Sequence, residues 1–206
     1  MKTPLISLIA ALVLLTGCAS KFQMLEIDGA TGRFIDKAPI TQEEIKVNKP
    51  FAGIKEIPFI YVRSASDVRD EQLLTAFTQD SLMKLDFPRT IKEQELTQLV
   101  IKGGLSSEIQ NLYHPIALHR LSKTIGPFLI LQTSITYVSE ARFRMDAVIF
   151  DPVSAEVIFS ATRQKVVWAS IEDEIFFPMM NVLKDWHKKS ELLPTPKALP
   201  PAGRGV

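Results

Sequence analysis

The sequence predicts an α+β domain whose mixed, mostly antiparallel sheet is covered by helices in two or three layers. Three observations support this fold class. In the first half, one-sided helical patterns alternate with short apolar runs. Three long β-type segments then follow one another between residues 128 and 168, and a last amphipathic helix comes after them. This order is typical of a sheet with helices packed on it.

The first half of the domain is predicted to hold two strands and three helices. The first strand is a β-rich apolar run with Pro58 near its start, where a missing N–H does least harm. Leu74, Phe77, Ser81 and Leu85 recur at spacings of three and four, which indicates a helix with one apolar face. The predicted elements are a strand at 57–62, a helix at 70–86, a short strand at 90–92, a helix at 93–100 and a helix from Pro115 to Ile125.

The second half is predicted to hold three antiparallel strands at 128–138, 141–150 and 156–168. The first has a continuous apolar start, which favours a central position with both faces buried. In the second, apolar and polar residues alternate strictly, so that Arg142 and Arg144 share the polar face.

The last helix is predicted to begin near Ser170, with Asp173 three residues later as a capping box. Pro178 is expected to kink or restart it. Its packed face carries Met179, Val182, Leu183 and Trp186. Trp186 is expected in the core, and the competing interpretation makes it an exposed anchor for a partner.

The first seventeen residues predict an export signal. Lys2 precedes the apolar run from Leu5 to Leu15, which is too short to span a bilayer. The run ends at Leu15-Thr16-Gly17-Cys18, which resembles the bacterial lipobox. Cys18 is therefore the predicted lipidation site and mature first residue, although a buried free cysteine is the competing interpretation. The resemblance implies acyl chains that anchor the protein, and Ala19, where Asp favours inner-membrane retention, points to the periplasmic face of the outer membrane.

Composition sets the domain organisation and excludes some partners. We expect a signal peptide at 1–17, a lipidated tether with a small hairpin at 18–50, a globular domain at 51–190 and a disordered Pro/Gly-rich tail at 191–206. Lys2 is the only charged residue before Cys18, so the mature chain has equal numbers of basic and acidic side chains. This balance gives no electrostatic footprint for nucleic acid.

The sequence contains no pattern that predicts catalysis, a cofactor or a metal site. His114 and His119 are five residues apart and so do not share a helix face as a zinc pair would. Gly103-Gly104 lacks the further residues of a phosphate loop. The acidic run 172–174 is explained by its place at the start of a helix. We therefore expect a protein that is not an enzyme.

A family resemblance rests on three segments: Gly103-Gly104-Leu105, residues 126–136 with their glycine, apolar strand and Ile-Thr end, and the hairpin at 151–160. Together they resemble the CsgG-like domain of curli-secretion lipoproteins, of the activator lipoproteins of penicillin-binding proteins and of a neisserial surface lipoprotein family. Ala155, where those families usually have Gly, and Pro127-Phe128 depart from the pattern. The resemblance implies protein–protein work at the outer membrane.

Two classes of function follow. The first is a non-enzymatic lipoprotein that assembles or regulates an envelope complex and also self-associates, with Arg142, Arg144 and Trp186 as candidate contacts to a partner; solvated charges are the competing interpretation of the two arginines. The second is a periplasmic module for a small molecule or lipid, bound in a cleft that residues 176–180 line.

Overall fold

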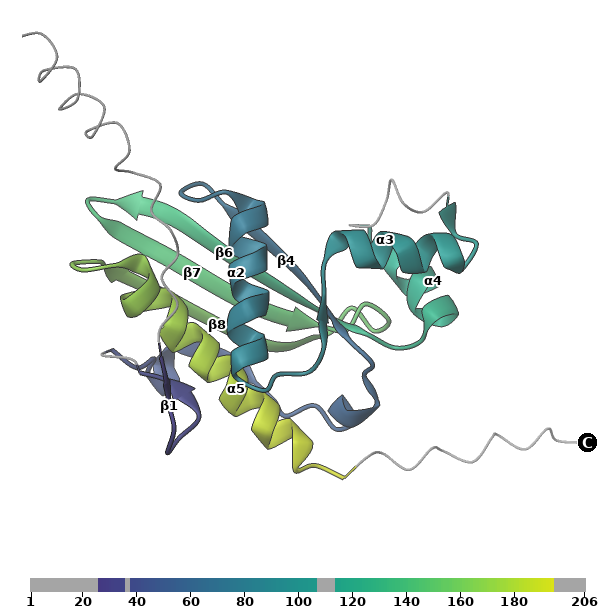
Figure 1. The fold of residues 1–206 in the computed structure, drawn as a ribbon, viewed down its shortest axis with the longest axis horizontal. Helices are drawn as coiled ribbons and strands as arrows, with labels where there is room; N and C mark the ends of the chain where they lie inside the picture. The colour runs from purple at the N-terminus through teal and green to yellow at the C-terminus, as the bar shows by residue number, and fades with distance from the viewer. Residues whose placement is uncertain (1–25, 36–37, 107–113, 195–206) are drawn as a thin grey trace, which may run out of the picture.

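The computed structural model describes residues 26–35, 38–106 and 114–194. It confirms the predicted fold class: an α+β fold built on an open, mixed six-stranded sheet, with a small two-stranded sheet beside it (Figure 1). The predicted signal peptide, Cys18 and the part of the predicted tail beyond Pro194 lie outside the described residues. Within those residues, no helix is long and apolar enough to cross a membrane.

The main sheet has the strand order β3-β8-β7-β6-β4-β5. β4 pairs in parallel with both β5 and β6, and the other pairs are antiparallel. As predicted, β6 lies inside the sheet. The strands are β3 (Ile45–Asn48), β4 (Ile60–Ser66), β5 (Thr90–Ile91), β6 (Leu129–Ser139), β7 (Arg142–Phe150) and β8 (Val157–Val166).

Helices cover the two faces of the sheet unequally. The chain crosses from β4 to β5 through α2 (Glu71–Lys84), and it returns from β5 to β6 through α3 (Glu93–Lys102) and α4 (Pro115–Ile125). α2 and α5 (Phe177–Glu191) lie along one face, whereas α3 and α4 lie at the parallel end of the sheet (Figure 1). Two separate apolar clusters result, one on each face. The domain therefore has three layers at its parallel end and two layers elsewhere.

Most elements match the prediction within a few residues, and α4 has the predicted bounds. β4 differs more, because it begins at Ile60 instead of Ile57 and continues through a polar segment to Ser66. Parallel pairing explains the extension, since Ile60 to Ser66 matches Leu129 to Ile135 residue by residue. A hydrogen bond of 2.8 Å between the hydroxyls of Ser64 and Thr133 stabilises the polar half.

The N-terminal segment packs closely on the domain. The predicted hairpin is present as β1 (Ile27–Asp28) and β2 (Arg33–Phe34). Asn181 of α5 fixes it, because the side-chain amide accepts a hydrogen bond from the Phe34 N–H and donates one to the Phe34 carbonyl, each 2.9 Å long. Short 3-10 turns, η1 (Gln42–Glu44) and η2 (Ile54–Glu56), flank the edge strand β3.

Strand β3 was not predicted. It lies within the segment that the sequence analysis assigned to the tether, yet it pairs with β8 in the main sheet. Four residues are too few for alternation to identify a strand, and here the partner strand supplies the pairing.

The last helix starts as expected around Ser170, whose hydroxyl accepts a hydrogen bond from the Asp173 N–H at 3.0 Å. A π-helical segment, η4 (Glu172–Phe176), comes first, and α5 follows with Pro178 in its first turn. The Phe177 N–H bonds to the Glu172 carbonyl five residues back, so the π-helical pattern ends where Pro178, which has no N–H, restarts the regular helix as expected.

Candidate functional site

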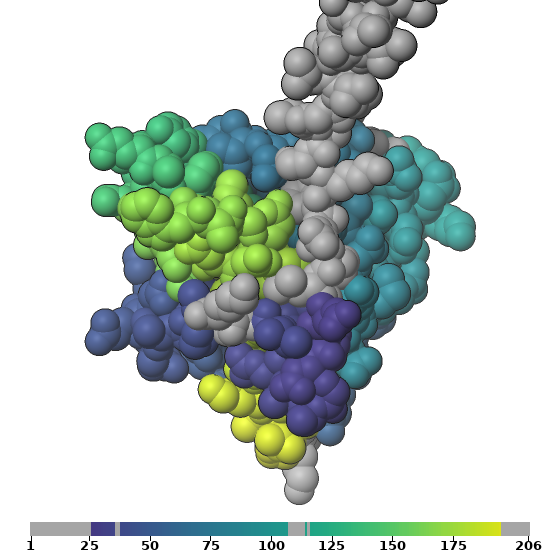
Figure 2. Space-filling model, turned by 60° about the vertical axis from the view of Figure 1, so that its left-hand side comes forward, coloured from purple at the N-terminus to yellow at the C-terminus, as the bar shows by residue number. Residues whose placement is uncertain are grey.

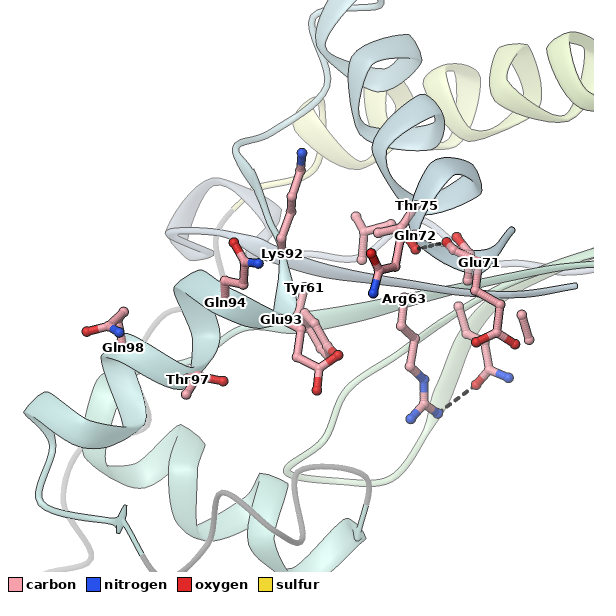
Figure 3. Close-up of a pocket in the computed structure, with 14 residues that line it drawn as sticks. Tyr61, Arg63, Glu71, Gln72, Thr75, Lys92, Glu93, Gln94, Thr97 and Gln98 are labelled. Carbon is pink, nitrogen blue, oxygen red and sulfur yellow. Dashed lines mark hydrogen bonds between the residues drawn. The ribbon is translucent and has the colours of Figure 1, made fainter. Parts of the chain in front are cut away.

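A polar groove opens at the parallel edge of the sheet, between the first turns of α2 and α3. Its volume is about 910 Å³. Figure 3 shows side chains from α2 on one side of β4 and side chains from α3 on the other. We call it the β4 groove. Its lining residues are Tyr61, Val62, Arg63, Ser64, Ala65, Glu71, Gln72, Thr75, Lys92, Glu93, Gln94, Thr97, Gln98 and Gln132.

The groove exists because β5 is much shorter than β4. β5 pairs with β4 at Ile60 and Tyr61 and ends at Ile91, and the chain then turns into α3. β4 continues to Ser66. Among the described residues, no strand pairs with this part of β4 on the β5 side. The sheet therefore has an open edge at the floor of the groove.

The direction of the free main-chain groups follows from one hydrogen bond. The Ile60 N–H donates to the carbonyl of Arg89 at 2.8 Å, so the main-chain groups of Ile60 face β5. In a parallel strand these directions alternate from residue to residue. Ser64 therefore turns both its N–H and its carbonyl to the groove, and the Val62 carbonyl faces the same way.

The side chains of the groove balance in charge. Arg63 is half-buried, and its Nη2 donates a 2.6 Å hydrogen bond to Oε1 of Gln132. Its guanidinium also lies 5.7 Å from the centre of the Phe150 ring. Lys92 adds a second cation, and Glu71 and Glu93 add two anions. The remaining polar groups are mainly amides and hydroxyls, among them four glutamines.

Such a lining suits a neutral polar ligand. A glutamine amide both donates and accepts, so it can bind either group of a peptide bond. An open strand edge offers the same pair of groups at regular spacing, and extended peptides bind such edges by adding a strand. The arrangement can therefore hold a peptide main chain.

The two predicted arginines are exposed on β7 and lie outside the groove. Arg144 is bound to Asp146 through two hydrogen bonds of 2.9 Å. This pairing raises the pKa of Arg144, because the carboxylate stabilises the charged guanidinium. Asp146 also accepts a 2.6 Å hydrogen bond from the Thr162 hydroxyl. Arg142 begins β7 near the β6–β7 turn.

Trp186 is completely buried. Its Nε1 donates a 2.7 Å hydrogen bond to the Lys49 carbonyl, and its ring lies 5.7 Å from that of Phe159. This burial supports the core interpretation, because a residue without exposed surface cannot contact a partner of the folded domain.

The two histidines and the segment 176–180, which the sequence analysis considered as site candidates, have structural roles. His114 caps α4 by accepting a hydrogen bond from the Ile116 N–H, and His119 lies 3.2 Å from the Val153 carbonyl oxygen. Within the described ranges, no group of three His, Cys, Asp or Glu side chains could hold a metal. Phe176, Phe177, Met179 and Met180 are fully buried, so this segment is core and not the wall of a cavity.

The acidic run at the start of the last helix is also held by local contacts. Glu172 forms a 3.4 Å ion pair with Arg69. Glu174 accepts 2.7 Å bonds from the N–H groups of Trp168 and Ala169 and pairs with Lys165 at 2.7 Å. Burial acts to raise the pKa of Glu174, but these contacts outweigh it and leave the pKa below its ordinary value.

The sequence analysis did not find the β4 groove. One signal was available: a strand of only three predicted residues, directly followed by a helix with Gln94 and Gln98 one turn apart. The register that leaves Ser64 without a strand partner on the β5 side joins segments far apart in the sequence, and no local pattern reveals it.

Comparison with protein-family models and with curated proteins gives no match. Among solved structures, the LpoB C-terminal domain from Salmonella enterica has a TM-score of 0.40 at 14% identity, covering 59% of this chain and 89% of that one. Lipoprotein GNA1162 from Neisseria meningitidis has a TM-score of 0.37 at 15% identity, with coverages of 54% and 82%. A PelC dodecamer from Paraburkholderia phytofirmans has a TM-score of 0.38 at 11% identity, with coverages of 68% and 90%.

Proposed function

We propose that this protein is a lipid-anchored, non-enzymatic lipoprotein of the bacterial envelope that binds an extended segment of a partner protein in the β4 groove. Through this contact it assembles or regulates an envelope complex, as the resemblance to the CsgG-like domain implies. The observation that carries the proposal is the open edge of β4, which lies at the floor of a polar groove.

A bound segment would continue the line of β5 along β4. The carbonyl of Val62 and both main-chain groups of Ser64 would bind its backbone, as in other complexes formed by strand addition. Glutamine and threonine side chains from α2 and α3 would bind its remaining peptide groups. Because these contacts bind the backbone, the segment must be extended and must carry few charges. Its exact sequence matters less.

The alternative of a small-molecule or lipid-binding module has less support. The segment on which it depended, residues 176–180, is buried in the core. The β4 groove is open and rich in amides and charges, which does not suit an acyl chain.

The anchor has its own test. Replacement of Cys18 by Ser removes the thiol that accepts the diacylglyceryl group, so the product should be an unprocessed precursor or a soluble periplasmic form. Membrane fractionation and intact mass measure the outcome. A processed, membrane-bound Cys18→Ser protein would contradict lipidation at Cys18.

The groove is tested by site-specific photo-crosslinking in cells, with the crosslinking residue at position 98. Both Gln98 and the control position Met83 are exposed, but Met83 lies outside the groove. We expect a discrete adduct from position 98 and none from position 83. Mass spectrometry of the adduct should identify one segment of one envelope protein.

A matched pair of variants then separates the main-chain contact from the side chain. Ser64→Pro removes the N–H that faces the groove, whereas Ser64→Ala keeps it; both lose the hydroxyl bond to Thr133. Proline is tolerated at an open strand edge. The adduct should disappear in Ser64→Pro and persist in Ser64→Ala, with circular dichroism confirming that both fold. An equal yield in both variants would refute binding by strand addition.

A further inference from the structure

Three large side chains are exposed at the end of the sheet where β6, β7 and β8 project. Tyr137 is 52% exposed and Val138 44%, both near the end of β6, and Trp168 just after β8 is 86% exposed. We call this group the hairpin end. Tyr137 also packs edge-on against Phe143, with ring centres 5.6 Å apart. Because Phe143 is partly buried and packs against the core, the exposed patch is continuous with the core.

The three residues lie on neighbouring parts of the same end. The N–H of Val167 donates a 2.9 Å hydrogen bond to the Ala141 carbonyl, which places Trp168 beside the β6–β7 turn. In Figure 2 the green β6–β7 turn and the lime chain around residue 168 are neighbours. Two strand spacings of about 4.8 Å separate β8 from β6, so Trp168 and Tyr137 can enter one surface together.

Charges around the hairpin end do not favour an anionic partner. Arg142 is an exposed cation there, but Glu140 and Asp67 are exposed anions, and Asp67 accepts a 2.9 Å hydrogen bond from the Tyr137 N–H. Lys165 is already paired with Glu174. The partner that fits this surface is therefore apolar with a polar border that carries no net charge.

The first described residues run toward the same end of the sheet. The Gly32 carbonyl accepts a hydrogen bond from Lys184, and Phe34 is bound to Asn181, so β2 runs toward the start of α5. β1 is antiparallel to it, and the Glu26 carbonyl binds the Ile35 N–H. Followed back to Glu26, β1 therefore runs toward η4 and Trp168.

The predicted tether is also long enough to reach the hairpin end. Seven residues lie between Cys18 and Glu26, and the eight steps from one residue to the other span at most about 28 Å when extended. Phe177 packs on Phe34. The distance along the helix from Phe177 back to Ser170 is only about 10 Å, which is less than the reach of the tether. A lipid on Cys18 can thus lie in a membrane that touches the hairpin end.

We infer that the hairpin end docks on the surface of a phospholipid bilayer, with Trp168 and Tyr137 at the level of the headgroups. The inference rests on the proposed lipid anchor. Tryptophan and tyrosine are the residues enriched at membrane interfaces, because one part of the ring system is apolar and the other polar. Three side chains bind weakly alone, but the anchor makes the contact intramolecular and raises its effective concentration.

The test uses the lipidated full-length protein, purified from membranes and reconstituted into vesicles of phosphatidylcholine with brominated acyl chains, which quench nearby indoles. The chain contains two tryptophans, and Trp186 is fully buried as an internal reference. We expect the emission of Trp168 to be quenched and that of Trp186 to persist. The Trp168→Phe variant should show no quenching, and phosphatidylglycerol in the vesicles should not increase it in wild type.

The outcomes separate the docking surface from the anchor. Protein that floats with the vesicles while Trp168 stays unquenched would overturn the docking and leave the anchor intact. Protein that does not float would overturn lipid anchoring and the docking with it. A blue shift of Trp168 emission that rises with protein concentration without vesicles would instead assign the hairpin end to contact between two copies, and would also overturn the inference.

Discussion

Replacement of Trp186 by Ala is expected to destabilise the domain more than most single changes. The indole is fully buried against Phe159, and its N–H is bound to the Lys49 carbonyl. Truncation of a core tryptophan costs about 3–5 kcal/mol through lost apolar contacts and the cavity left behind. With a urea m-value of about 2 kcal/mol per molar, a loss of about 4 kcal/mol lowers the unfolding midpoint by about 2 M.

Two further variants test whether this loss of stability comes from burial of the Trp186 side chain. Trp186→Phe keeps an aromatic ring but loses the hydrogen bond to Lys49, so much of the packing should remain and the loss should be smaller than in Trp186→Ala. Trp168→Ala removes the same type of side chain from an 86% exposed position and should change the free energy of unfolding by at most about 0.5 kcal/mol. Equal midpoints for Trp186→Ala and Trp168→Ala in urea titrations would refute the core assignment.

Two other residues give predictions of a different kind. Burial lowers the pKa of His187, against the opposing effect of Glu191. The unfolded chain therefore binds more protons, and stability should fall as the pH drops below about 6.5. The His187→Gln variant should flatten this pH dependence in urea titrations between pH 7.5 and 5.5, and an unchanged slope would exclude His187 as its source. Asn181→Leu leaves the buried N–H and carbonyl of Phe34 unpaired, which should cost about 2–4 kcal/mol and expose the turn at Gly32 to proteases, unless the hairpin is held mainly by the Phe34–Phe177 contact.

The sequence predicted elements wherever a local pattern was long enough. The bounds of α4 followed from Pro115 at its first turn and from the apolar spacing of Leu118, Leu121 and Ile125, which need no knowledge of the partner. The alternation in β7 likewise identified the buried face, since Met145, Ala147 and Ile149 are all buried.

Features that depend on pairing between distant segments were missed. β3 is an edge strand of four residues, and β8 defines it more than its own composition does. The polar end of β4 looked like a loop because residues 64–67 contain no β-branched or aromatic side chain. Only the parallel register with β6 shows that this segment is a strand, and only the early end of β5 shows that its edge is open.

The two proposed surfaces can operate together because β6 extends further than β4. The last residue of β4, Ser66, pairs with Ile135, whereas β6 continues to Ser139. Four strand residues span about 13 Å, so a bilayer in contact with the hairpin end would stay about that far from the end of the β4 groove. Strands β4 and β6 would then point toward the membrane, and a segment bound along β4 would lie along the same axis while the groove opens sideways. Membrane contact through Trp168 and partner contact through Ser64 should therefore be lost independently, and Trp168→Phe should leave the crosslink at position 98 unchanged.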